Sequence, residues 1–325
     1  MTTLPPSTLP GAAPIGLRSD IISARNVAKH WGPNVALADI DIELERGVTG
    51  LLGSNGAGKT TFMSLVLGLH DRTAGEMTVL GHDPQTEGAK VRGRIGYAPE
   101  HHHLPPDVQA NDLVRHLAQL HGLPKRAATE RASDAMWQVG LGEERFRPIG
   151  TMSTGQRQRV KLAGAIAHDP ELILLDEPTD GLDPVQRDDM LELIARIGGE
   201  FGIDILLSSH LLDEVDRICD NVVIFGGGRV TRSGPLAALR GAVTGLTLEV
   251  DHDADAVARV LVAAGCSVDV DGLRLTVTAE DSAQLHDLAR DAVADTGVGL
   301  RQLKDRQVTL EDVFLEANDA TDNAS

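Results

Sequence analysis

Hydrophobic and polar positions divide the chain into two parts. Between residues 21 and 240, short apolar runs alternate with longer segments of helical periodicity. Three of these runs, at 48–52, 171–175 and 203–208, have the β-branched or leucine-rich composition of short buried strands. Buried strands separated by helices are typical of an α/β layer. Residues 21–240 are therefore predicted to form an α/β domain.

The pattern changes within that domain. From residue 104 to residue 141 helical periodicity continues without an obvious strand, and helices are expected at 112–121 and 127–139. This stretch predicts a helical insert at about residues 100–165. Trp137 lies at an apolar spacing in the insert, which predicts core packing.

Beyond residue 240 the elements are smaller. Six of them follow in the order strand, helix, strand, strand, helix, strand, at 246–250, 254–264, 267–270, 273–278, 282–294 and 298–303. The order βαββαβ predicts a small α+β, ferredoxin-like accessory domain over residues 241–317, with a last helix at 310–316. Residues 1–20 and 318–325 are predicted to be a disordered and a frayed tail.

Charge and composition exclude some classes of protein. The 325 residues carry 30 basic and 48 acidic side chains, a formal net charge of −18, which disfavours binding nucleic acid through its phosphates. Residues 241–325 hold 6 basic and 17 acidic residues, a net charge of −11. No apolar run reaches the roughly 18 residues of a membrane span. Two cysteines, Cys219 and Cys266, fit a reduced cytosolic protein.

A glycine-rich loop supplies the first candidate chemistry. Residues 53–60 read GSNGAGKT, matching the pattern G-x-x-x-x-G-K-[ST] between a predicted strand and a predicted helix. Its backbone amides and the helix N-terminus would hold phosphate oxygens, Lys59 the β- and γ-phosphates, Thr60 a Mg²⁺ ion and Thr61 the α-phosphate. The alternative is a simple turn before a helix. The candidate nucleotide-binding residues are Gly53, Ser54, Asn55, Gly56, Ala57, Gly58, Lys59, Thr60 and Thr61.

Two carboxylates follow the strand predicted at 171–175. Asp176 stands where a P-loop NTPase places its magnesium-orienting carboxylate. Glu177 comes next and could accept a proton from the water that attacks the γ-phosphate. Pro178 predicts an extended conformation for Glu177. The alternative is a solvated acidic turn after a core strand.

Residues 152–156, MSTGQ, resemble the signature loop of the ABC ATPase family, Leu-Ser-Gly-Gly-Gln. Ser153, Gly155 and Gln156 match, whereas Met152 and Thr154 depart from it. Ser153 and Gln156 also have the spacing of a capping box at a helix start. The family implies that this helix N-terminus closes on the ATP of a second subunit; the alternative is a capped helix without a ligand.

Three more segments are similar to the same family, in the same order. Asp183 ends a loop, DGLD, that the family places at its dimer interface. His210 ends SSH and is implied to contact the γ-phosphate and orient Glu177. Trp31 falls where the family stacks an aromatic ring on adenine, with core packing as the alternative.

One position departs from the family in a way that matters. The segment that joins the core to the helical insert usually carries Gln, but here it ends in Glu100. A glutamate can still reach Mg²⁺ or water, although it adds negative charge beside the triphosphate. The three histidines at 101–103 follow it; a solvated loop is favoured for them over a metal site, with a permease contact as a weaker option.

Together these features are identified as a P-loop, ABC-type ATPase core with a helical insert and an accessory domain. The resemblance implies a homodimer, or a heterodimer with a paralogue, that binds two ATP with Mg²⁺ and hydrolyses them beneath a separate integral-membrane permease. The chain would then be cytoplasmic, held at the inner face of the plasma membrane by the permease. Residues 309–315 resemble the accessory domain of drug- and lipid-type exporters.

Two other readings remain open from the residues. A soluble ABC ATPase acting on the ribosome or DNA usually has two ATPase domains or coiled-coil arms, whereas this chain has one such domain and no sustained heptads. Its acidity also argues against binding nucleic acid. A regulatory subunit with degenerate chemistry would lack some of Lys59, Asp176, Glu177 and His210, all of which are present.

Overall fold

The computed structural model describes residues 20–100, 104–241, 244–279, 284–307 and 310. Its central sheet has the strand order β5-β6-β7-β3-β8-β9. The first five strands are parallel, and β9 pairs antiparallel with β8 at the edge. Their bounds are β5 Ile95–Ala98, β6 Leu172–Asp176, β7 Asp204–Ser209, β3 Val48–Leu52, β8 Asn221–Gly226 and β9 Arg229–Pro235.

The strands β3, β6 and β7 are buried along their whole length. Such burial needs layers on both faces of the sheet, which explains why these strands read as continuous apolar runs in the sequence. The predicted α/β fold is confirmed, and two of the three strands are shifted by one residue from the predicted bounds.

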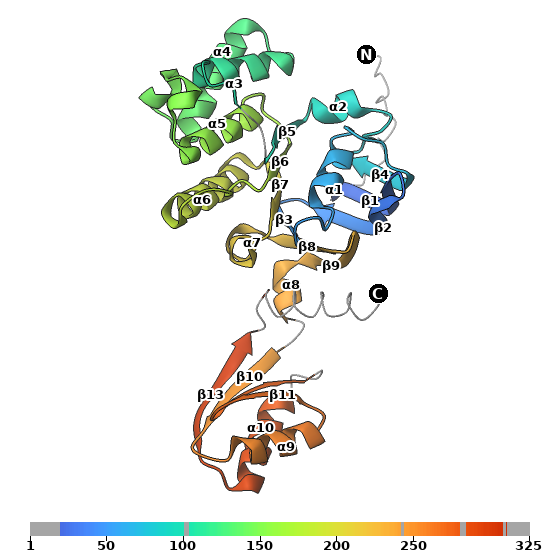
Figure 1. Cartoon of the computed structure of the whole chain (residues 1–325), viewed down its shortest axis with the longest axis vertical. Coiled ribbons are helices and arrows are strands. Elements are labelled where there is room, and N and C mark those ends of the chain that lie inside the picture. The colour runs from blue at the N-terminus through green and yellow to red at the C-terminus, as the bar shows by residue number, and fades with distance from the viewer. Residues whose placement is uncertain (1–19, 101–103, 242–243, 280–283, 308–309, 311–325) are drawn as a thin grey trace, which may run out of the picture.

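A second sheet, of order β2-β1-β4, is antiparallel and was not predicted. It consists of β1 (Asp20–Trp31), β2 (Asn34–Glu45) and β4 (Ala74–Val79). Its buried side chains share a core with helix α1 (Lys59–Val66). The core includes Ile22, Ile40 and Phe62, each fully buried. This sheet therefore supports the helix that follows the phosphate loop (Figure 1).

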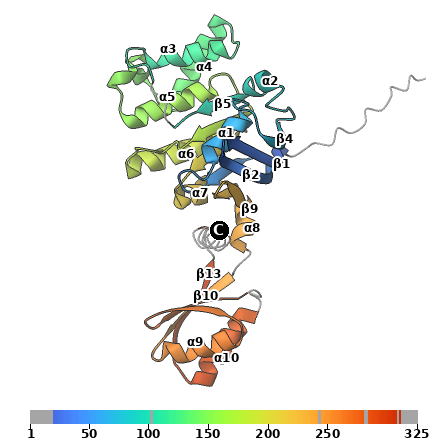
Figure 2. The same cartoon turned by 45° about the vertical axis from the view of Figure 1, so that its right-hand side comes forward.

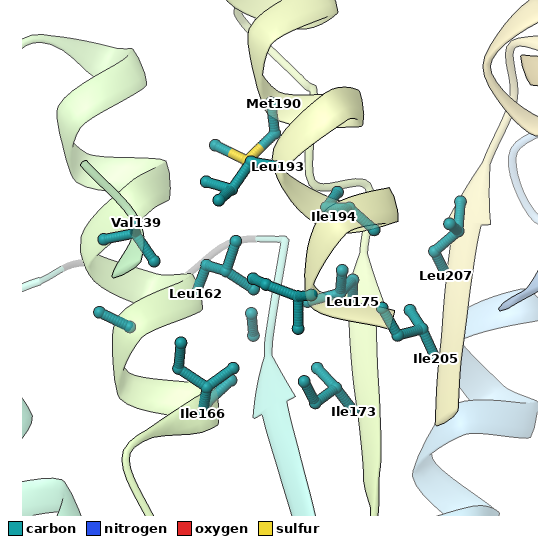
Figure 3. Packing of buried hydrophobic residues seen from close by; sticks show 14 of the residues in the cluster. Val139, Leu162, Ile166, Ile173, Leu175, Met190, Leu193, Ile194, Ile205 and Leu207 are labelled. Carbon is teal, nitrogen blue, oxygen red and sulfur yellow. The ribbon is translucent and has the colours of Figure 1, made fainter. Parts of the chain in front are cut away.

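The helical insert packs on the opposite side of the central sheet (Figure 1). Its helices are α3 (Ala110–Leu120), α4 (Lys125–Gln138) and α5 (Thr154–Ile166). Figure 3 shows Leu162 and Ile166 of α5 beside Ile173 and Leu175 of β6, in the same cluster as α6 (Pro184–Phe201). The predicted core role of Trp137 is wrong, because its side chain is 70% exposed. Ala135 and Met136 take the buried positions instead.

Shorter elements complete the ATPase part. They are α2 (Gly88–Arg92), the 3-10 turns η1 (Glu143–Phe146) and η2 (Ile149–Thr151), α7 (Leu212–Ile218) and α8 (Leu236–Gly241). No helix among the described residues is long and apolar enough to cross a membrane.

The C-terminal module, residues 244–307, has its own antiparallel sheet of order β11-β12-β10-β13. Helices α9 and α10 lie on one face of it (Figures 1 and 2). The predicted βαββαβ order is confirmed, with β10 Thr244–Val250, α9 Ala254–Ala263, β11 Ser267–Asp271, β12 Arg274–Thr278, α10 Leu285–Thr296 and β13 Leu300–Gln307. The helix expected at 310–316 lies outside the described residues except for Leu310, which is buried in the core of the ATPase part. Both predicted tails also fall on residues that the structure does not describe, apart from Asp20.

Candidate active site

The loop between β3 and α1 is shaped by glycines that cannot be replaced without strain. Gly53, Gly56 and Gly58 have φ angles of 156°, 83° and 111°. A Cβ atom on Gly53 would lie 2.7 Å from the carbonyl oxygen of Phe225, and one on Gly58 would lie 2.6 Å from Leu37. Since only glycine fits these positions, the loop can turn its amides towards one point at the start of α1, which is the arrangement that binds phosphate.

Lys59 is the first residue of α1 and is only 6% exposed. Its Nζ atom donates to the carbonyl oxygen of Gly53 at 2.7 Å and lies 3.3 Å from Oε1 of Glu177. The ammonium group is thus held over the loop by partners on both sides. A phosphate in the loop would meet a cation that needs little reorganisation.

Three oxygen-bearing side chains meet at the ends of β6, β7 and the loop. Ser208 donates its hydroxyl to Oδ1 of Asp176 at 2.7 Å, and the hydroxyl of Thr60 lies 3.4 Å from the same oxygen. Asp176 and Ser208 are direct register partners in neighbouring parallel strands. A carboxylate beside a threonine hydroxyl is a donor set that Mg²⁺ accepts together with phosphate oxygens and water. Thr60 and Asp176 therefore fit the predicted metal position.

Glu177 makes contacts through both carboxylate oxygens. Oε2 lies 2.8 Å from Nδ1 of His210, while Oε1 faces Lys59. Glu177 is only 7% exposed, and the His210 ring is 47% exposed. The buried carboxylate thus lies between a lysine and a histidine at the sheet edge. This is an arrangement suited to holding a base in one orientation.

The predicted extended backbone of Glu177 is wrong. Its φ angle is 47°, in the left-handed region that costs a non-glycine residue about 1–2 kcal/mol. The chain turns sharply here, because the amide of Asp180 donates to the carbonyl of Glu177 at 3.1 Å. The Glu177 amide is fixed by Ser208, to whose hydroxyl it donates at 2.9 Å. Such strain at the end of a strand aims the carboxylate at the loop, and it is a feature seen at functional sites.

A cavity of about 420 Å³ opens over residues 54–61 of the phosphate loop and the start of α1, and Glu177 lines it too. Trp31 lies on its wall and is 43% exposed, so it does not pack in the core. The Nζ atom of Lys29 sits 4.1 Å from the Trp31 ring centroid, and His70 makes an edge contact with the ring at 4.8 Å. Residues 34–36, at the start of β2, also line the cavity. Sequence reasoning missed them because they carry no charge or motif.

Glu100 lines the same cavity from the strand exit of β5. The backbone there is held by Lys161 of α5, whose Nζ donates to the carbonyls of Pro99 (3.1 Å) and Glu100 (2.8 Å). Burial lowers the pKa of Lys161. Burial, with the nearby Asp176 and Glu100 carboxylates, raises the pKa of Tyr97 to about 12. Lys161 was not singled out from the sequence, and residues 101–103 lie outside the described residues.

The predicted signature residues form a second, separate group. Ser153 and Gln156 make the expected capping box: the Gln156 amide donates to Oγ of Ser153 at 3.2 Å, and the Ser153 amide donates to Oε1 of Gln156 at 3.1 Å. Gly155 packs on Gln186 so closely that a Cβ atom would lie 3.0 Å from its amide oxygen. Asp183 caps the neighbouring helix α6, accepting from the Gln186 amide at 2.9 Å.

This second group does not share the cavity of the phosphate loop. None of Ser153, Gly155, Gln156 and Asp183 is among the described residues that line it. The predicted site residues therefore fall into one cluster around Lys59 and Glu177 and another at the start of α5 and α6. Among the described residues, the second cluster is therefore separate from the cavity of the phosphate loop.

Comparison with known proteins agrees with this geometry. Residues 37–180 match the family described as ABC transporter. The linearmycin resistance ATP-binding protein LnrL of Bacillus subtilis is 33% identical over 70% of this chain and 73% of its own. The daunorubicin resistance ATP-binding protein DrrA3 of Streptomyces coeruleorubidus is 30% identical over 90% of this chain and 94% of its own.

An importer subunit and a solved structure extend the comparison. The methionine import ATP-binding protein MetN 2 of Burkholderia pseudomallei is 33% identical over 78% of this chain and 68% of its own. The structure of cbiO1 from Clostridium perfringens, described as part of the ABC transporter complex cbiONQ, superposes with a TM-score of 0.61 at 28% identity, over 67% of this chain and 89% of that one. The chain belongs to the ABC transporter ATP-binding family, and it is an ATP-binding, ATP-hydrolysing subunit that powers such a transporter.

Proposed function

We propose that this subunit pairs with a second ATPase subunit around two ATP molecules and powers export through a separately encoded membrane permease. The observation that carries the proposal is the group at the mouth of the phosphate loop in which buried Lys59, Asp176 and Glu177 meet the half-exposed His210. All the groups that hydrolysis of ATP requires from one chain are near one another there.

The roles follow from the contacts. Loop amides and Lys59 bind the β- and γ-phosphates, and Trp31 on the cavity wall offers a ring face to the adenine base. Glu177 takes a proton from the attacking water, while His210 holds the carboxylate in position. Mg²⁺ bound near Thr60 and Asp176 would neutralise charge on the triphosphate.

Pairing is supported by the second group of residues. The start of α5 presents a helix N-terminus, and the Asp183 side chain at the start of α6 is exposed. In the part of the chain that the structure describes, neither lines the cavity of the phosphate loop. ATP held by this chain's own phosphate loop would not reach the start of α5. The γ-phosphate of ATP held by a second subunit is an anion that this helix N-terminus could bind. Expressing this chain alone and together with a paralogous ATPase subunit would show whether the second subunit is a copy or a paralogue.

A permease docking position is supported by an apolar hollow beside the helical insert. It has a volume of about 180 Å³ and is lined by Leu67, Leu69, Leu117, Tyr97 and His121 among others. Leu69 is 53% exposed. Tyr97 lines the hollow, and Glu100, three residues further along the chain, lines the nucleotide cavity. A permease segment docked in the hollow could therefore move with the backbone that positions Glu100. Occupancy by a permease would place the chain at the inner face of the plasma membrane.

Export is favoured over import by the extent of the similarity. DrrA3, a resistance protein by name, matches 90% of this chain and so includes most of its C-terminal module. The substrate class that we propose is a drug, lipid or similar amphipathic compound. Import, as in the name of MetN 2, is the second candidate. Uptake of a labelled candidate substrate by inside-out vesicles holding subunit and permease supports export; accumulation only in right-side-out vesicles supports import.

The test of the site is the substitution Glu177→Gln. It should keep ATP binding, slow hydrolysis by about 10³-fold and trap an ATP-bound dimer, because the amide cannot accept the proton. Phosphate release and size-exclusion chromatography with ATP measure these effects. Glu171→Gln, at the other end of β6 in an exposed pair with Arg94, is the matched control and should leave hydrolysis unchanged. Hydrolysis at the parental rate in Glu177→Gln would rule out the base assignment.

A second measurement separates transport from the alternative function. Affinity purification of the tagged chain from membranes should recover a polytopic membrane protein. Recovery of ribosomes or DNA instead, with no membrane protein, would favour the soluble ABC ATPase.

A further inference from the structure

One buried carboxylate has no part in the site described above. Glu214, on helix α7, is 1% exposed and is not among the described residues that line the cavity of the phosphate loop. Burying a carboxylate costs free energy unless its charge is paired and its oxygens are bonded. The partners of its two oxygens therefore indicate its role.

The first oxygen is bonded beside His210. Ser209, the last residue of β7, donates its hydroxyl to Oε2 of Glu214 at 2.6 Å. The same hydroxyl oxygen accepts from the amide of Leu211 at 3.0 Å. Ser209 and Leu211 stand on either side of His210, so one hydroxyl closes the turn that carries the histidine. Glu214 fixes the direction of that hydroxyl through a short bond to a charged acceptor.

The turn matters because packing alone does not hold His210. The side chain of His210 is 47% exposed, and its Nδ1 atom lies 2.8 Å from Oε2 of Glu177. A half-exposed ring takes its orientation largely from the backbone that carries it. A displacement of Glu214 would thus reach His210 through Ser209, and through His210 it would reach the carboxylate of Glu177.

The second oxygen of Glu214 faces helix α6. Its Oε1 atom lies 3.4 Å from Nε of Arg187, and neither atom makes a hydrogen bond to another described residue. Arg187 lies in the first turn of α6, where its amide donates to the carbonyl oxygen of Asp183 at 2.9 Å. The contact between α6 and Glu214 is therefore an ion pair without a hydrogen bond. Such a pair can tighten or lengthen when the start of α6 shifts.

We propose that Glu214 is a positioning residue for His210, and that Arg187 ties this positioning to the start of α6. The inference rests on the pairing of subunits and the role of His210 proposed above. A second subunit that packs on Asp183 would shift the first turn of α6. Since α6, Glu214, Ser209 and His210 form one connected series, the shift would change how His210 holds Glu177. Hydrolysis would in this way depend on the presence of the second subunit.

A second ion pair joins the same two helices and provides a matched control. Arg217 of α7 pairs with Asp188 of α6, and their side chains are 48% and 62% exposed. Neither residue is bonded to Ser209 or His210 in the described part of the chain. If Glu214 served only to hold α7 on α6, breaking either pair would affect stability alone.

Nuclear magnetic resonance of the whole chain, labelled with ¹³C in its histidine rings, tests the positioning role without nucleotide. The loss of one signal in His210→Gln assigns that residue. Glu214→Gln keeps the shape of the side chain but places a donor against Arg187, so it should shift the His210 signal. Asp188→Asn should leave that signal at its parental position. A His210 signal that stays in place in Glu214→Gln would overturn the positioning role.

Steady-state kinetics test whether Glu214 acts through His210. Glu214→Gln should lower kcat about tenfold and change KM for ATP less than about twofold, because Lys59 and the loop are not altered. In a His210→Gln background the same substitution should change kcat less than about twofold, since both changes act on one group. A tenfold loss in both backgrounds would overturn the proposal. Asp188→Asn should keep the parental kcat.

Substitution of Arg187 tests the link to α6. Arg187→Gln should lower kcat about as much as Glu214→Gln, and Arg187→Lys, which keeps the charge, should recover most of it. Thermal melting identifies an assay temperature at which every variant is folded. A parental kcat in Arg187→Gln would overturn the link. The resonance experiment needs neither ATP nor a second subunit, so its result is independent of whether Glu177→Gln traps an ATP-bound dimer.

Discussion

The two clusters of predicted site residues differ in how they are completed. Around the phosphate loop, Lys59, Asp176 and Glu177 are each less than 10% exposed and bonded to other residues of the same chain. At the starts of α5 and α6, the side chains of Ser153 and Asp183 make hydrogen bonds only within their own helix caps, and Asp183 is exposed. One half-site is preorganised within the chain, whereas the other presents its polar groups outwards.

This difference shows how ATP bound to one subunit could bring a second subunit to it. A preorganised half binds the nucleotide at low reorganisation cost, and an outward-facing half gains a ligand only when a second subunit brings one. Binding to one chain and pairing of two chains should thus be separable by mutation. The predictions below test this separation, beginning with the largest effect.

Lys59→Ala should weaken ATP binding by about 100-fold, since a charge-assisted bond to phosphate is lost from a buried position. The loss should appear already in dilute, monomeric protein, measured by calorimetric titration. Lys90→Ala, which removes an exposed lysine paired with Glu87, serves as the control. Unchanged affinity in Lys59→Ala would mean that the loop amides alone hold the nucleotide.

Trp31→Ala should weaken binding by about tenfold, because stacking of a base on an aromatic ring is worth about 1–3 kcal/mol. This effect also belongs to the single chain and should not depend on protein concentration. In Trp31→Phe much of the affinity should remain, while the fluorescence change on adding ATP should disappear. A response that persists in Trp31→Phe would have to come from Trp137 and would remove Trp31 from the adenine site.

Part of this arrangement could be predicted from the sequence. The loop motif fixes its own geometry, because the glycines, the lysine and the threonine act within one short segment. The capping box at Ser153 is also local. Local patterns of this kind transfer directly from sequence to structure.

The rest depends on contacts between distant segments. Ser208 bridges Asp176 and the Glu177 amide only because β6 and β7 are register partners, which no sequence pattern records. In the sequence Lys161 cannot be distinguished from other lysines on helices, because its role depends on the packing of α5 against the end of β5. The left-handed backbone of Glu177 contradicts the preference of a residue before proline, and tertiary bonds impose it. Trp137 shows the reverse error, since apolar spacing alone does not say which face of a helix is covered.

Ser153 tests the outward-facing half. Ser153→Ala should lower ATP-dependent pairing and hydrolysis about fivefold while ATP binding to dilute protein stays unchanged, and it should destabilise the fold by about 1 kcal/mol through the lost helix cap. Light scattering with ATP measures pairing, and thermal melting measures stability.

Ser153→Asp separates the cap from the ligand. Aspartate caps a helix as well as serine does, so stability should be kept, but its charge would repel a phosphate of the second subunit and abolish pairing. If Ser153→Asp pairs normally with ATP, the start of α5 is a capped helix without a ligand. The two half-sites would then not differ in the way described.

The smallest effect is expected at Glu100. Its backbone carbonyl is bonded by Lys161 of α5, the helix whose start carries Ser153. Glu100→Gln removes a negative charge from the cavity that we propose holds the triphosphate, so ATP without Mg²⁺ should bind about threefold more tightly. Binding with Mg²⁺ should change less, because the ion already neutralises part of the phosphate charge. Affinities measured with excess Mg²⁺ and with EDTA give this ratio, and Glu130→Gln on the exposed face of α4 is the control. The Lys161 bonds go to backbone carbonyls and survive the substitution, so a changed ratio reports the charge of Glu100 itself. An unchanged ratio would place that carboxylate outside the shell of the metal and phosphates.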